Sequence, residues 1–142
     1  MTVRLPFSRI TGLAICLMAS RCSSFLSAPH IDGSGESYAL WVTVQVAHAE
    51  RDYYRRFGTY APLDEVLRNS PEQLAQGLRD ISTFGYQVSL KVLESGFSLS
   101  TAPVDRDGKK ASGRQSFYID QTYIMRHSWL PDIASVASPE LH

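Results

Sequence analysis

The stretch Ala39–Gly58, ALWVTVQVAHAERDYYRRFG, carries the strongest structural pattern of this 142-residue chain. Apolar residues recur in it at steps of three and four, which predicts an amphipathic helix that starts near Glu36. Gly58 is expected to end the helix, because glycine adopts the left-handed conformation of a helix stop at little cost. The predicted buried face holds Val42, Val46, Ala49, Tyr53 and Phe57, and it is widened by Leu40, Val44, Ala47 and Tyr54.

The element that covers this face is predicted further along the chain, where apolar and polar residues alternate. Short turns separate these segments, so an antiparallel meander is the simplest topology. The predicted strands begin at Tyr86, at Phe97 and at Phe117, and a last strand, after a tight turn at Asp120 and Gln121, runs from Thr122 to Arg126.

The residues between helix and sheet predict less regular structure. The connector Thr59–Asn69 has at most a turn of helix. Ser70 and Pro71 then resemble the cap and first position of a second, short helix that ends before Gly85. The expected fold is therefore α+β, with a long N-terminal helix packed on a three- or four-stranded antiparallel meander.

The first residues are typical of an export signal. Arg4 and Arg9 precede the apolar run from Ile10 to Ala19, which small residues follow. This run is short for a membrane span, and export is favoured over a buried helix. The predicted organisation is an export signal (1–24), a linker rich in Pro and Gly (25–36), a domain (37–127) and a tail (128–142). The protein is then periplasmic, in the outer envelope or secreted.

Both cysteines, Cys16 and Cys22, lie in or next to the leader, so no disulfide is expected within the domain. Cys22 is a candidate for lipidation, although Arg21 stands where a small residue usually precedes a lipid-modified cysteine. Membrane contact is expected only through the leader or such a lipid anchor.

The charge balance argues against a nucleic-acid partner. The chain has 14 basic and 14 acidic residues, and three of the basic ones, Arg4, Arg9 and Arg21, belong to the leader. The remainder is slightly acidic, whereas nucleic-acid binding depends on neutralising phosphates.

Several segments in order resemble the globular head of type IV pilins and pseudopilins. The helix sequence ends in alanine, glutamate, aromatic residues and a glycine, and Gly85-Tyr86 resembles the "GY" strand of that family. The segment from Gly113 to Asp120 resembles its "G-x-x-S-F-x-x-D" hairpin. The resemblance covers residues 38 to 127. It implies a non-catalytic interaction or structural domain with protein partners in the cell envelope, associated with a pilus or a secretion system, and no cofactor.

The leader departs from the family pattern. Pro29, Gly33 and Gly35 would interrupt the continuous helical stalk of a pilin, because proline removes a backbone donor and clashes inside a helix. Tyr123 stands where the hairpin usually has a glycine. The chain therefore resembles a detached pilin head behind an ordinary export signal. A free-standing envelope lipoprotein and a small periplasmic hydrolase or metal-binding protein are the alternatives.

No residue is predicted to be catalytic or to bind a metal. His48 and Asp52 are one helical turn apart, which is a weak metal pattern without further ligands. No nucleophile elbow or phosphate-binding loop is found. The candidate partner surface combines two tryptophans with the charged loop Asp105–Gly113, and its residues are Trp41, Trp129, Arg106, Lys109 and Lys110.

Overall fold

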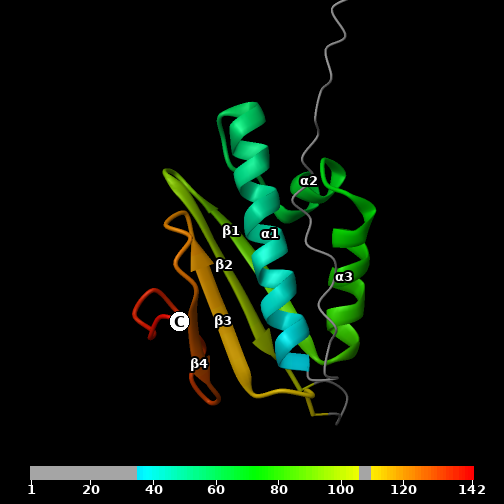
Figure 1. Ribbon diagram of the computed structural model, residues 1–142, viewed down its shortest axis with the longest axis vertical. Helices are drawn as coiled ribbons and strands as arrows, with labels where there is room; N and C mark the ends of the chain where they lie inside the picture. Colours follow the sequence, from blue (N-terminus) through cyan, green and yellow to red (C-terminus); the bar gives the residue numbers. More distant parts are fainter. Residues whose placement is uncertain (1–34, 106–109) are drawn as a thin grey trace, which may run out of the picture.

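The computed structural model describes residues 35–105 and 110–142, which form three helices and one four-stranded sheet (Figure 1). The strands follow in the order β1-β2-β3-β4, and each neighbouring pair is antiparallel. The predicted α+β class and the meander are therefore confirmed, while the export signal and residues 25–34 lie outside the described part. The elements are α1 (Gly35–Phe57), α2 (Leu63–Arg68), α3 (Glu72–Thr83), β1 (Tyr86–Leu93), β2 (Gly96–Pro103), β3 (Gln115–Asp120) and β4 (Arg126–Trp129).

The core lies between α1 and the sheet, with α3 packed beside α1 (Figure 1). Val42 and Val46 of the predicted stripe are fully buried, as are Phe97 and Leu99 of β2. Removal of these side chains from water is the main force that holds the helix on the sheet. One polar contact also crosses this layer, because the buried hydroxyls of Thr43 and Thr101 lie 2.7 Å apart.

The predicted burial is wrong at the C-terminal end of α1. Tyr54 and Phe57 are 46% and 54% exposed, because the last turns of the helix extend beyond the sheet (Figure 1). The helix ends as expected at Gly58, which has a φ of 72° and donates its N–H to the Tyr54 carbonyl oxygen at 2.8 Å. Each exposed ring packs on a partly buried tyrosine: the centroids of Tyr54 and Tyr60 lie 4.6 Å apart, and those of Phe57 and Tyr53 lie 4.4 Å apart.

The short helices close the side of α1 that the sheet does not cover. Leu74 and Ile81 of α3 are buried, and Gly77 brings the helix so near α1 that a Cβ there would lie 2.9 Å from Trp41 Cζ3. The predicted cap of α3 is wrong. The Ser70 hydroxyl donates to the Val66 carbonyl oxygen at 2.7 Å, and no side chain caps the helix.

The last strand starts later than predicted, at Arg126 instead of Thr122. The Asp120 carboxylate accepts hydrogen bonds from the Thr122 amide at 2.9 Å and from the Thr122 hydroxyl at 2.6 Å. Tyr123 then adopts a positive φ of 59°, a conformation that cannot continue a strand. The turn at Asp120 is thus longer than the sequence indicated, and β4 includes Trp129.

Candidate interaction surface

The chain does not leave the sheet after β4 but returns along it. The Leu130 amide donates to the Arg114 carbonyl oxygen at 2.9 Å, which fixes the end of β4 beside the start of β3. The buried Ser116 hydroxyl of β3 accepts a hydrogen bond from the Ala134 amide at 2.8 Å. Residues 130–142 contain little regular secondary structure, as expected for the tail, yet they are bonded to the domain.

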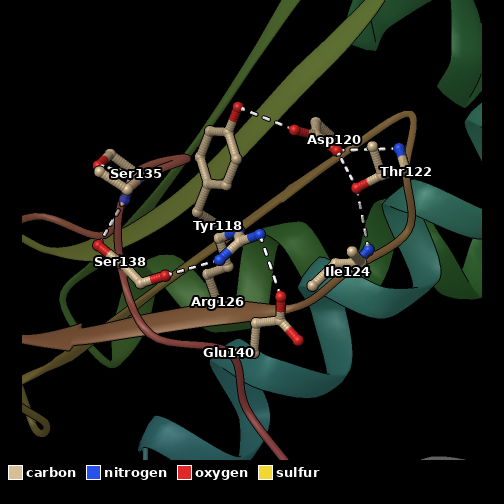
Figure 2. A network of polar contacts seen from close by, with 9 residues as sticks. Tyr118, Asp120, Thr122, Ile124, Arg126, Ser135, Ser138 and Glu140 are labelled. Carbon is tan, nitrogen blue, oxygen red and sulfur yellow. Dashed lines mark hydrogen bonds and ion pairs between the residues drawn. The ribbon is translucent and has the colours of Figure 1, made fainter.

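Arg126 is the centre of the contacts that hold this returning segment (Figure 2). Its guanidinium donates to the Ser138 carbonyl oxygen at 2.9 Å and forms an ion pair with Glu140 at 3.3 Å. An exposed ion pair contributes little, but Arg126 is largely buried and one of its partners is a backbone carbonyl. Its side chain therefore fastens the segment to β4.

Backbone hydrogen bonds add to this attachment. The His127 amide donates to the Pro139 carbonyl oxygen at 3.1 Å, and the Leu141 amide donates to the Met125 carbonyl oxygen at 2.8 Å. Residues 139–141 therefore occupy part of the outer edge of β4, where unpaired backbone groups would otherwise face solvent.

Three large apolar side chains are exposed here, one at the end of β4 and two on the segment after it. Trp129, Ile133 and Val136 are 57%, 50% and 63% exposed, and we call them the C-terminal surface. Exposed apolar side chains of this size, near one another in the sequence, are candidates for an interaction site. Their backbone is fixed by Ser116 and Arg126, so the fold presents them without a partner being bound.

The predicted partner residues are not brought together. Trp41 is half-buried between α1 and α3, where its ring lies 5.5 Å from that of Tyr38 and its indole N–H has no partner among the described residues. Trp129 lies on β4, at the edge of the sheet opposite β1. Lys110 is exposed in the loop between β2 and β3, whereas Cys22, Arg106 and Lys109 lie outside the described residues.

Sequence reasoning identified Trp129 but missed Ile133, Val136 and the role of Arg126. The signal for the first two was weak, since it consisted of isolated apolar residues in a short polar segment between Pro131 and Pro139. The role of Arg126 depends on contacts with Ser138 and Glu140, which are 12 and 14 residues further along the chain. No local sequence pattern predicts such contacts.

The described part of the chain contains no cluster of three His, Cys, Asp or Glu side chains that could hold a metal ion. His48, the weak metal candidate, has a lowered pKa because of its burial and the nearby positive charge of Arg51. Among the described helices, none has the length and apolar character required to cross a bilayer.

Comparison of the chain with protein-family models, with curated proteins and with solved structures finds no match.

Proposed function

We propose that this chain is an exported, non-catalytic, pilin-like domain that presents its C-terminal surface to a protein partner in the cell envelope. The observation that carries the proposal is the exposure of Trp129, Ile133 and Val136 on a segment that the domain itself holds in place. A pilus or a secretion system is the setting that the sequence resemblance suggests.

A surface that is ordered before binding favours association. Fixing a flexible segment upon binding costs conformational entropy, and here Ser116 and Arg126 have already ordered the backbone. Tryptophan is also enriched among residues that dominate binding energy. Trp129 with its two aliphatic neighbours thus has the chemistry expected of a protein-binding surface.

The motif glycines have a physical role that is consistent with the resemblance. A Cβ at Gly113 would collide with the Tyr86 hydroxyl and with the side chain of Glu36, and one at Gly85 would lie 2.7 Å from Ala111 Cα. The Glu36 carboxylate accepts the Arg114 amide at 2.9 Å at this junction. Gly113 therefore allows the first turn of α1 to contact Tyr86 at the start of β1, and Gly85 allows the loop before β3 to approach the same strand.

Photo-crosslinking in the source cells tests the proposal. A photoreactive phenylalanine analogue replaces Val136 in one strain and the exposed Gln73 of α3 in a matched control. We expect a discrete protein adduct from position 136 in the envelope or secreted fraction and none from position 73. The adduct should be lost when Trp129→Ser is added.

Two results would contradict the proposal: retention of the protein in the cytoplasm, or equal adduct patterns from positions 136 and 73. The lipoprotein alternative is tested in the same fractions. If Cys22 carries a lipid, Cys22→Ser releases the protein from membranes, whereas the proposal without an anchor expects no change in the fractionation.

A further inference from the structure

Glu50 is a buried carboxyl group that the proposed function does not use. It lies near the end of α1 and is fully inaccessible to solvent. One oxygen accepts a long hydrogen bond of 3.4 Å from the Ala61 amide. The other oxygen has no hydrogen-bond partner among the described residues. Burial of an ionised carboxylate with so few partners is strongly unfavourable.

The groups around Glu50 come from three parts of the chain. Tyr53 belongs to α1, Tyr60 to the connection after α1, and Tyr123 to the turn between β3 and β4. Burial raises the pKa of all three phenols, that of Tyr123 to about 12, and the negative charge of Glu50 adds a smaller contribution to each. The Phe97 ring contacts Tyr60 and Tyr123, with centroids 5.2 Å and 5.9 Å away.

The charged groups nearby do not neutralise Glu50. The Arg51 guanidinium lies 5.8 Å from the centre of the Tyr123 ring, and Arg55 is paired with Asp52 at 3.6 Å. On α2, Glu65 and Arg68 pair with each other. Within the described ranges no Lys, Arg or His forms an ion pair with Glu50. The buried site therefore favours the protonated, neutral form of the Glu50 carboxyl group over the ionised form.

We propose that Glu50 is a proton-sensitive latch. In the neutral state it allows the connection at Ala61 and the turn at Tyr123 to close over the end of α1, and its ionisation loosens both. The inference is independent of the proposed function, because α1 ends at the opposite end of the sheet from Trp129 (Figure 1).

The direction of the effect follows from burial. Burial raises the pKa of Glu50 from 4.5 to about 7, and the Ala61 amide offsets only part of this. The closed state thus binds the proton more tightly than a state in which Glu50 meets water. Closure is favoured most at acidic pH and is weakened as the pH rises from 4.5 through about 7.

Amide hydrogen exchange of the full chain tests the latch. Exchange is measured at about pH 5.5 and about pH 8 and corrected for the intrinsic pH dependence of exchange. We expect the corrected rates of residues 58–61 and 121–125 to rise about tenfold or more between these conditions. Glu50→Gln, which is uncharged at both pH values, should abolish the rise. Asp52→Asn, at the exposed neighbouring acid, should retain it.

The latch is overturned if the wild-type protein and Glu50→Gln show the same pH profile in these segments. A second measurement does not depend on any variant. The carboxyl carbon resonance of Glu50 in the wild-type protein is followed by NMR during a pH titration. A midpoint near 7 is expected, whereas a midpoint at the ordinary value for glutamate of about 4.3 rejects the proposal.

Discussion

Thr43 and Thr101 form a polar contact between the helix and the sheet. Both are fully buried in an otherwise apolar layer, and their hydroxyls lie 2.7 Å apart. The Thr43 hydroxyl also lies 2.7 Å from the Ala39 carbonyl oxygen. The Thr101 hydroxyl can therefore donate to the Thr43 hydroxyl, while the Thr43 hydroxyl donates to the Ala39 carbonyl oxygen of α1. Neither hydroxyl is left without a partner.

Replacement of one member of the pair should be more damaging than replacement of both. Thr43→Val leaves the buried Thr101 hydroxyl without its partner, which should cost about 1–3 kcal/mol of unfolding free energy. Thr101→Val added to Thr43→Val should recover most of that loss, because two valines of similar shape leave no unpaired group. Urea unfolding of Thr43→Val, Thr101→Val, the double variant and the wild type measures the difference. Strict additivity of the two single losses would show that the hydroxyls do not interact.

At the scale of elements, β4 and the segment that returns along it depend on Arg126. Its guanidinium joins Ser138 and Glu140, and its own strand pairs with β3 (Figure 2). The segment buries few apolar groups apart from Ala134 and the partly buried Leu141. Its order should therefore be sensitive to the loss of these polar contacts.

Arg126→Met should release the segment while preserving the rest of the sheet. Methionine keeps an apolar stem but lacks the guanidinium, so we expect a loss of about 1–2 kcal/mol in unfolding free energy. Cleavage by chymotrypsin after Trp129 should become clearly faster at equal enzyme concentration. Arg114→Met removes an exposed arginine that has no ion pair among the described residues, and it serves as the control. If both variants are cleaved at the wild-type rate, Arg126 does not fasten the segment.

The sequence allowed the helix and the first three strands to be located because their patterns are local. Val42 and Val46 repeat at helical spacing, and Gly58 is a strong stop. The start of β4 was misplaced because the Asp120 carboxylate extends the preceding turn. The exposure of Tyr54 and Phe57 was missed because the helical pattern does not report where the sheet ends. The apolar face of α1 is longer than the sheet that covers it, so its last residues stay exposed.

For the candidate site, the sequence indicated only Trp129. Ile133 and Val136 lie on a segment that is held by hydrogen bonds of Ser116 with Ala134 and of Arg126 with Ser138. These bonds join positions far apart in the sequence, so no local pattern predicts them. Trp41 illustrates the opposite case. It lies off the main stripe of α1, yet α3 packs against it at Gly77. A helix face that appears free in the sequence was covered by a second helix.

At the scale of the whole molecule, exposed apolar groups gather in two regions. Tyr54 and Phe57 lie at the end of α1, and Val92 and Leu93 lie at the tip of the β1–β2 hairpin, near the same end of the molecule (Figure 1). The C-terminal surface lies on β4 and the segment after it. Of these two groups of described residues, the C-terminal surface is the one that contains a tryptophan, a residue type enriched among those that dominate binding energy.

The central claim is that the domain holds the C-terminal surface in place before any partner binds. Amide exchange of the isolated full chain, resolved by NMR, tests it most directly at Leu130, Ala134 and Leu141, whose N–H groups donate to Arg114, Ser116 and Met125. We predict that all three exchange at least about 100-fold more slowly than in an unstructured peptide. Exchange of these amides at the rates of an unstructured chain, while those of β2 remain protected, would contradict the claim.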